Sequence, residues 1–400
     1  MRLGKAPNYT GRMPPAKPSM DLVRSATDEH VLRAFLAQSR LTRAELAVRT
    51  GLSKPTASES VRRLTEAGLL RDTGERTTGR GRVGSYYALS DTLGTAVVAG
   101  IAPEGIAVEV VDVRGEVVTR VVEPVDRPAG ATEVTERLRA AVAQAVAGSA
   151  VPTRLAVVSA ADPVDRSTGR LVHLPDAPFL LGEVLPVEAL APLVDGPVLV
   201  DNDVNWAARA ERDAAAPRPL MDFSYLYLGE GLGCAVVSDG QVRRGHVGIA
   251  GEIAHMVTCG PRGRAMRFTD VFAALGLRQG GTTAIDTDAV LRMLDGSSAR
   301  ATGVRTALAR AIGGVLAAAV ALTDPELVVL GGPWGVHPAM LEAVREDFGA
   351  QPRPVPVRAA VVLDEPSLRG ARTAALEELR ATVLAPGLRS VAGAPGVVGR

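Results

Sequence analysis

A run of polar and charged side chains between Ser53 and Ala67 has the composition of a surface that reads DNA. The apolar residues Ala57, Val61 and Leu64 recur at helical spacing, so we expect them to face a core. The opposite face would carry Thr56, Ser58, Glu59, Arg62 and Arg63, with Lys54 at the N-terminal tip. Lysine and arginine can pair with guanine, glutamate can accept a hydrogen bond from cytosine, and hydroxyls can serve a base or a phosphate. The alternative is a solvated helix face that carries ordinary charges.

Arginines also gather in a glycine-rich segment downstream of this helix. Two runs, 69–75 and 84–89, are expected to form a hairpin of strands with Arg80 and Arg82 at its tip. Such a tip can enter a minor groove or neutralise phosphates. Both arginines are therefore candidate DNA contacts.

The elements ahead of this hairpin carry clear local signals. Residues 21–39 have helical periodicity, and a second helix begins at a capping box made by Thr42 and Glu45. A glycine turn follows, and Ser53 caps the third helix. Three helices and a basic hairpin predict a winged helix-turn-helix over residues 21–90, which favours DNA binding over the solvated face.

The charge distribution supports a polyanionic partner for this end of the chain. Residues 1–90 carry sixteen Lys and Arg against eight Asp and Glu, whereas the remainder carries twenty-nine against thirty-six. A bias toward arginine in the genome explains the excess of Arg over Lys but leaves the asymmetry between the two parts unexplained. We expect residues 1–20 to be a disordered basic arm and 384–400 a flexible tail.

The protein is expected in the cytoplasm, without a membrane segment. The N-terminus lacks an apolar signal core, and two cysteines give no disulfide framework. The most apolar helical stretch, Ile312 to Leu322, is too short to span a membrane and is expected to be a buried core helix.

From residue 91 the pattern changes to alternating strands and helices. The first set comprises strands at 95–101, 106–113 and 116–122, a helix at 132–147 and a strand at 154–159. The second comprises strands near 223–229, 233–238 and 241–243, a helix at 303–322 and a strand at 327–330. A strand–strand–strand–helix–strand order that occurs twice predicts two ribonuclease-H-like lobes. We place them at 91–383, divided near residue 200, with the C-terminal helix returning to the first lobe.

Five segments carry a family resemblance. They are 46–54 and 64–68 in the helix-turn-helix, 202–205 (Asn-Asp-Val-Asn), 245–255 (GHVGIAGEIAH) and 324–332, which begins Asp-Pro-Glu-Leu. On these segments, the chain from about 20 to 382 resembles the ROK family, which groups repressors, open reading frames and sugar kinases. The resemblance implies an α/β fold, in which a winged helix-turn-helix precedes a bilobed, actin/hexokinase-type ROK domain.

In this family, kinase activity implies a general base and two phosphate-binding loops. Asp203 matches the base, which takes the proton from the attacking sugar hydroxyl. The first phosphate motif, D-x-G-x-T, falls where the chain has Ala102, Glu104 and Ile106 in place of the Asp, one Gly and the Thr. The second loop carries Glu230 in place of a threonine, and a carboxylate that faces phosphates is repulsive. We therefore predict a tight hairpin there, no enzyme activity and no catalytic residue, with Asp203 a relic of the base.

The zinc site implied by the resemblance also lacks ligands. His255 and Cys259 are present, but Val257 and Arg264 occupy two of the cysteine positions. Two ligands cannot complete a structural zinc tetrahedron, so we predict no metal and no cofactor.

The resemblance further implies that Asn202, Asp203, Glu252 and His255 hold sugar hydroxyls. Carboxylates accept hydrogen bonds from hydroxyls and an imidazole can donate or accept, which suits a polyol. If Glu252 and His255 share one helical turn, both would point into one cavity. Three supporting positions depart from the family pattern, at Asp162, Asp176 and Met266. The alternative is a satisfied polar network between the lobes.

These patterns predict a sequence-specific transcriptional regulator, expected to be a repressor, that binds a double-stranded DNA operator as a homodimer or dimer of dimers. The second domain would sense a sugar-like effector or serve only for oligomerisation. The competing class is a ROK sugar kinase that carries an extra DNA-binding domain.

Overall fold

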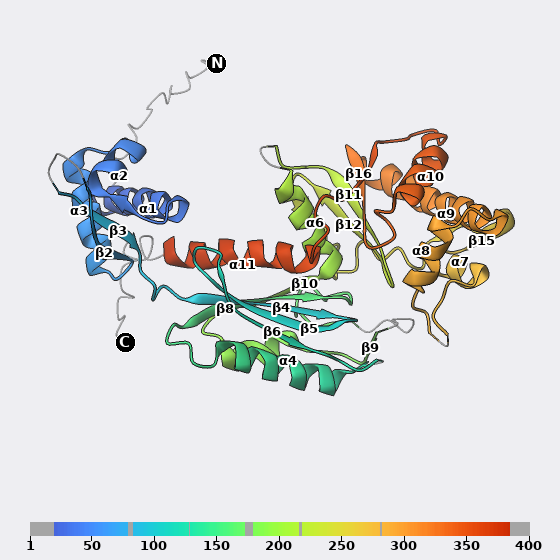
Figure 1. Cartoon of the computed structure of the whole chain (residues 1–400), viewed down its shortest axis with the longest axis horizontal. Coiled ribbons are helices and arrows are strands. Elements are labelled where there is room, and N and C mark those ends of the chain that lie inside the picture. Colours follow the sequence, from blue (N-terminus) through green and yellow to red (C-terminus); the bar gives the residue numbers. More distant parts are fainter. Residues whose placement is uncertain are drawn as a thin grey trace, which may run out of the picture. The chain divides into compact units, whose positions relative to one another are not determined.

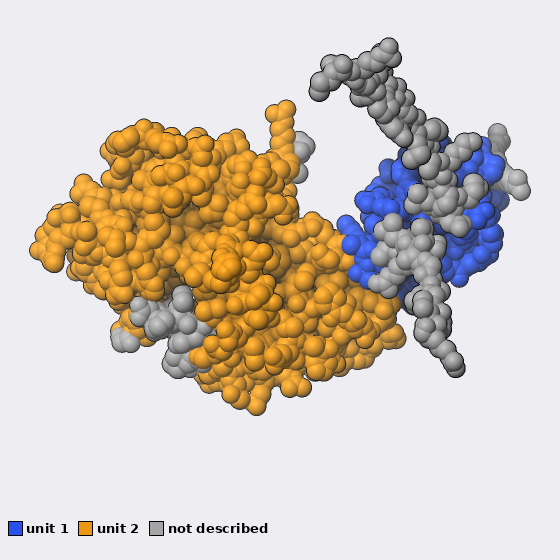
Figure 2. All heavy atoms as spheres, turned by 180° about the vertical axis from the view of Figure 1, so that it is seen from behind, with its two compact units in different colours: residues 1–93, 380–400 blue, residues 94–379 orange. Residues whose placement is uncertain are grey.

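The computed structural model describes residues 20–78, 83–127, 129–172, 179–215, 218–280 and 282–384. Residues 1–19 of the predicted basic arm, Arg80, Arg82, Asp176 and the predicted tail from residue 385 lie outside this part of the chain. The chain divides into two compact units (Figure 2), residues 1–93 with 380–400, and residues 94–379.

The N-terminal unit has the element order of a winged helix-turn-helix (Figure 1). Its elements are α1 (Met20–Ala37), β1 (Leu41–Thr42), α2 (Arg43–Thr50), α3 (Lys54–Glu66), β2 (Leu70–Arg76) and β3 (Ser85–Leu89). The strands form an antiparallel sheet in the order β1-β3-β2. Strand β1 was not predicted, because two residues give no periodicity to detect.

Local capping signals start the helices of this unit where the sequence predicts. The backbone N–H of Glu45 donates to Thr42 Oγ1 at 3.2 Å, and the Thr42 N–H donates to Glu45 Oε2 at 2.8 Å. Gly51 ends α2 in the left-handed conformation, at φ 70°. Ser53 Oγ then accepts from the Thr56 N–H at 3.2 Å and begins α3. Together these contacts satisfy backbone donors that a helix start leaves free.

The second unit contains two five-stranded sheets. Strands β4 (Thr95–Ala102), β5 (Gly105–Asp112), β6 (Val117–Glu123), β8 (Thr153–Ala160) and β10 (Val198–Asn202) form the first sheet, with helix α4 (Ala131–Val146). Strands β11 (Phe223–Leu228), β12 (Leu232–Ser238), β13 (Gln241–Val242), β16 (Leu327–Gly331) and β17 (Val357–Ala359) form the second, with α9 (Ala299–Thr323) and α10 (Pro338–Gly349). Helix α6 (Asp203–Ala214) follows β10 and packs against strands β11 and β12 of the second sheet. The last described element is α11 (Pro366–Leu384).

Shorter elements complete this unit. They are β7 (Ala129–Gly130), β9 (Leu180–Leu181), α5 (Pro186–Leu190), the 3-10 turns Ala191–Leu193 and Pro261–Gly263, β14 (Val257–Cys259), β15 (Ala265–Arg267), α7 (Phe268–Leu275) and α8 (Thr287–Asp295).

The two sheets repeat one topology. The order is β6-β5-β4-β8-β10 in the first and β13-β12-β11-β16-β17 in the second. In each sheet the first three strands of the chain run antiparallel and the last two add in parallel. This repeat confirms the predicted fold class, a winged helix-turn-helix followed by a bilobed α/β domain.

Helices cover both faces of the first sheet, α4 on one side and α11 on the other (Figure 1). Val134, Leu138 and Val142 of α4 are buried in the core cluster of this lobe. On the α11 side, the Arg372 guanidinium binds the buried Glu109 carboxylate of β5 at 2.7 Å. Gly370 lets α11 lie against α6, because a Cβ there would be 1.9 Å from the Trp206 carbonyl oxygen.

Helix α9 is long and apolar enough to cross a membrane by length and composition alone. Ten of its residues are buried, and Leu308, Ile312 and Leu316 belong to the core cluster of the second lobe. The helix therefore packs as the core element that the sequence predicts.

Candidate functional site

Helix α3 has one buried face and one polar face, as predicted. Ala57, Ser60, Val61 and Leu64 are buried, whereas Lys54, Thr56, Glu59 and Arg62 are exposed and Ser58 is half-buried. The domain therefore holds α3 by its apolar side and leaves Lys54, Thr56 and Ser58 accessible at its N-terminal half, the part of a recognition helix that meets base edges.

Arg63 differs from Arg62 on the same helix because its guanidinium binds a residue of another helix, Asp28 of α1. Its Nη2 donates to Asp28 Oδ1 of α1 at 2.6 Å, and its Nε donates to Asp28 Oδ2 at 3.1 Å. The Ser60 hydroxyl donates to the same carboxylate. A bidentate pair of this kind ties α3 to α1, so the Arg63 guanidinium is engaged in positioning the helix.

Arg62 and Glu59 are paired with each other in the free protein. The Arg62 guanidinium binds Glu59 at 2.6 Å and Glu66 at 2.6 Å, and all three side chains are exposed. The hydrogen bonds from Arg62 lower the pKa of Glu59 below its usual value. An exposed cluster of this kind can exchange its internal pairs for contacts with DNA at little cost, since ion pairs that are open to solvent contribute little to stability.

One further exposed cation was missed at the sequence level. Arg49 lies in the last turn of α2, is exposed, and has no ion pair among the residues that the structure describes. Arg43 of the same helix stacks over the Tyr87 ring, with 4.9 Å between the guanidinium carbon and the ring centroid. The sequence does place Arg49 beside the glycine turn, but it does not show which way the Arg49 side chain faces.

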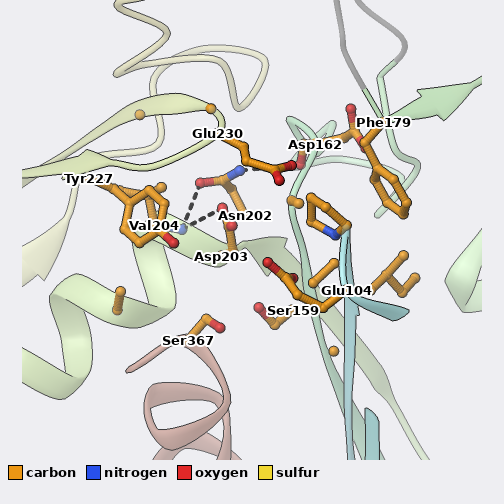
Figure 3. A pocket seen from close by; sticks show the side chains of 18 of the residues that line it. Glu104, Ser159, Asp162, Phe179, Asn202, Asp203, Val204, Tyr227, Glu230 and Ser367 are labelled. Atoms are coloured by element: carbon orange, nitrogen blue, oxygen red, sulfur yellow. Dashed lines mark hydrogen bonds between the residues drawn. The ribbon is translucent and has the colours of Figure 1, made fainter. Parts of the chain in front are cut away.

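A cavity of about 640 Å³ lies within the second unit. Its wall includes Asn202, Asp203, Glu252 and His255, the four side chains predicted to bind a ligand. In Figure 3, Asp203 lies at its centre and Glu104 points toward it from the turn between β4 and β5. The structure therefore brings the predicted residues to one cavity, although they come from separate segments of the chain.

The start of α6 fixes Asn202 and Asp203. The Val204 N–H donates to Asn202 Oδ1 at 3.0 Å and to Asp203 Oδ1 at 2.7 Å (Figure 3). The Asn202 side-chain amide also donates to the Ala160 and Asp162 carbonyl oxygens, at 3.4 and 3.3 Å. Asn202 is thus occupied by the helix cap and the neighbouring strand, which leaves Asp203 as the group that faces the cavity.

Asp201 is a second positioning residue that sequence reasoning missed. This buried carboxylate accepts hydrogen bonds from the Asn205 amide at 2.8 Å and from the Asn202 N–H at 2.9 Å. Arg244 pairs with it at 2.6 Å. Asp201 ends strand β10, and the sequence shows an amide, Asn205, four positions later, but Arg244, its other partner, is forty-three positions away.

Two carboxyl groups of the cavity have unusually high pKa values. The pKa of Asp203 is raised to about 7, mainly by burial and also by the charges of Asp162, Glu252 and Glu104, while the hydrogen bond from the Val204 N–H opposes the shift. The pKa of Glu252 is likewise raised to about 7, mainly by burial and also by the charge of Asp162. Both groups therefore lie in a dry, negatively charged environment that penalises their ionised forms.

Glu252 and His255 do not share a helical turn, so the condition under which helical spacing would bring both to one cavity is not met. Residues 251–256 form turns without a helix, and the Met256 N–H donates to the Ile253 carbonyl at 3.0 Å. Gly251, just before Glu252, has a φ of 94°, and a Cβ at this position would lie 1.8 Å from the Cys234 carbonyl oxygen. The glycine fixes a loop, and both side chains still line the cavity, with His255 exposed at its edge.

The segments in the place of the phosphate loops are tight hairpins. Residues 102–105 form the turn between β4 and β5, and 229–231 form the turn between β11 and β12. Arg127 Nη1 binds Glu230 Oε2 at 2.8 Å, and the Gln279 amide donates to Glu230 Oε1 at 3.2 Å. Arg127 Nε also donates to the Pro103 carbonyl oxygen at 2.6 Å, so this guanidinium links both turns.

The segment that corresponds to the zinc site is a two-stranded ribbon. Strand β14 pairs with β15, which places Cys259 opposite Ala265 and Val257 opposite Arg267. Within the described ranges, no three His, Cys, Asp or Glu side chains are grouped so as to hold a metal. Met266 packs against the core of the second lobe, whereas Asp162 lines the cavity.

Comparisons with known proteins match both units. The sequence pattern of the ROK family matches residues 101–378, and that of winged helix-turn-helix DNA-binding domains matches 24–71. Among characterised proteins, N-acetylmannosamine kinase from Citrobacter koseri is 29% identical over 192 residues. That match covers 46% of this chain and 62% of the kinase, so the chain spans less than two thirds of its relative's length.

Solved structures share the fold. A ROK family transcriptional regulator, described as a homologue of the Escherichia coli MLC protein, superposes with a TM-score of 0.65 at 16% identity. The match covers 92% of this chain and 100% of that one. The ROK hexokinase from Thermus thermophilus gives a TM-score of 0.55 at 27% identity, over 72% of this chain and 99% of that one.

Proposed function

The chain belongs to the ROK family, and we propose that it is a sequence-specific DNA-binding transcriptional regulator whose ROK domain has lost kinase activity. The observation that carries this proposal is the accessible polar face of α3 within a winged helix-turn-helix. Lys54, Thr56, Ser58, Glu59 and Arg62 would read bases, whereas Arg63 would position the helix. Arg80 and Arg82 would contact the backbone or the minor groove from the wing.

The ROK domain supports a role other than phosphoryl transfer. A kinase needs open backbone amides, cations or metal around the transferred phosphoryl group. In this chain, Glu230 stands in one phosphate turn and Glu104 in the other, and Arg127 is already paired with Glu230. Added phosphates would meet carboxylates at both turns.

One observation favours the sugar kinase alternative. Asp203 has a pKa of about 7, which suits a general base near neutral pH. A general base cannot support phosphoryl transfer without a site for the ATP phosphates. We therefore assign the cavity to effector binding. In a dimer, a change in the cavity would alter the spacing of the two DNA-binding domains, which must match half-sites about one helical turn apart.

We further propose that the regulator acts as a repressor in the cytoplasm. The test is selection of genomic fragments by the purified protein, followed by footprinting and by transcription from the selected promoters. A sequence-specific footprint that blocks transcription supports the proposal. Binding that ignores sequence contradicts it.

A further inference from the structure

The cavity carries more negative charge than hydrogen bonding to a neutral polyol requires. Among the described residues, six acidic side chains and one basic side chain line it: Glu104, Asp162, Asp203, Glu230, Glu252 and Glu365, with Arg120. Glu230 pairs with Arg127, and Arg120 pairs with Glu365. Glu104, Asp203 and Glu252 have no ion pair within the part of the chain that the structure describes.

These carboxylates affect each other electrostatically. The charges of Asp162, Glu252 and Glu104 all disfavour ionisation of Asp203, which burial disfavours most. A cation placed among them would relieve this repulsion and allow the carboxyl groups to ionise. An anion in the same place would increase the repulsion.

The buried hydroxyl of Ser159 is a second polar group in the wall of the cavity, independent of the carboxylates. Ser159 of β8 is 2% exposed, lines the cavity, and forms no hydrogen bond within the described residues. It lies near Glu104 and Ser367 of α11 in Figure 3. A buried hydroxyl without a partner is costly unless a ligand or water bonds to it.

The shape of the cavity favours an organic ligand over a metal ion. Its volume of about 640 Å³ is that of a small-molecule site. Its carboxylates come from separate segments of the chain, and the described residues include no group of three arranged as metal ligands.

We propose that the cavity binds a small polyol that carries a protonated primary amine, of the class of a free amino sugar, and rejects phosphorylated sugars. The ammonium group would lie among Glu104, Asp203 and Glu252, and hydroxyls of the ligand would bond to Ser159 and to the remaining carboxylate oxygens. This inference rests on the proposed role of the cavity as an effector site.

Calorimetry with the full-length protein tests the inference. The probes are the 2-amino forms of glucose, galactose and mannose, each beside its parent hexose and its N-acetyl form, with glucosamine 6-phosphate as the anionic probe. At pH 7, at least one free amine should bind tenfold or more tightly than its parent and its N-acetyl form. Binding should release protons, detected as a heat that changes with the ionisation enthalpy of the buffer, because the cation ionises Asp203 and Glu252.

Matched variants locate the site. Glu104→Gln should weaken amine binding at least fivefold, whereas Glu342→Gln, on the exposed side of α10, should leave it unchanged. The inference is overturned if no free amine binds at 10 mM, a ceiling roughly a hundredfold above a typical effector site, or if the parent hexoses or the phosphate bind as tightly. Specific DNA binding by the same preparation separates the two proposals: if it persists while amines fail, only this inference falls, and if it is absent, the proposed function falls.

Discussion

The Arg127 guanidinium lies 2.8 Å from the Glu230 carboxylate and joins the first lobe to the turn between β11 and β12. Arg127 also binds the Pro103 carbonyl in the turn between β4 and β5. The two turns that would hold nucleotide phosphates are thus held together by a protein ion pair. This arrangement suits a domain that keeps the kinase fold without the kinase reaction.

The first prediction is that the protein does not phosphorylate sugars. Glucose, mannose and N-acetylglucosamine should give no ATP-dependent product above a blank, because Glu104 and Glu230 face the phosphate positions. A coupled assay for ADP measures this. Activity that the Asp203→Asn substitution abolishes would show that the domain is a kinase.

The second prediction is that Arg63 positions helix α3, whereas Lys54 contacts DNA. Arg63→Ala should destabilise the N-terminal unit by about 1.5–3 kcal/mol, because it removes a charged hydrogen-bonded pair and leaves Asp28 half-buried. Lys54→Ala should leave the free energy of unfolding within about 0.5 kcal/mol of wild type and weaken DNA binding. Urea unfolding and a gel-shift titration measure the two effects. Equal losses of stability for both variants would refute the assignment of Arg63 to positioning and of Lys54 to DNA contact.

The third prediction concerns the wing. Arg80→Ala or Arg82→Ala should weaken binding to all DNA sequences by a similar factor and reduce the salt slope by about one. Affinity measured against salt concentration on operator and random DNA tests it. A loss restricted to the operator would mean that these arginines read bases.

The fourth prediction is a pH dependence of stability that comes from Asp203 and Glu252. Their folded pKa values are about 7, above the values of about 4 expected when unfolded. The folded state therefore keeps these protons longer, and stability falls as pH rises from about 4 to about 7 and then levels off. The double variant Asp203→Asn, Glu252→Gln should lack this decline, so its melting temperature should gain on wild type from pH 4.5 to pH 8. If the melting temperatures of the two proteins change in parallel with pH, the pKa values of Asp203 and Glu252 are not raised in the folded protein.

Local and repeated features of the fold could be predicted from the sequence. The capping box of Thr42 and Glu45 and the cap at Ser53 depend on residues three positions apart, so the sequence contains the whole interaction. The two lobes could be predicted because each repeats one order of strands. The Arg63–Asp28 pair spans 35 positions, and no local pattern indicates that this arginine faces inward.

The sequence predicted which residues line the cavity better than it predicted how they are arranged. Family motifs placed Asp203 and Glu252 at one cavity, and the structure brings them there. The sequence left open whether Glu252 and His255 share a helical turn. The structure has a loop there, which begins at Gly251 with a positive φ. The burial of the Ser159 hydroxyl could not be predicted, since it depends on how segments far apart in the sequence pack around the cavity.

The most direct test of the regulator assignment is genomic footprinting of the full-length protein beside its Glu59→Ala variant. We predict a small set of protected sites with a common sequence for the wild type. The variant should protect a broader set, with about 1–3 kcal/mol less discrimination at one base position. Protection without a common sequence, or an identical sequence preference in both proteins, would contradict recognition of DNA through α3.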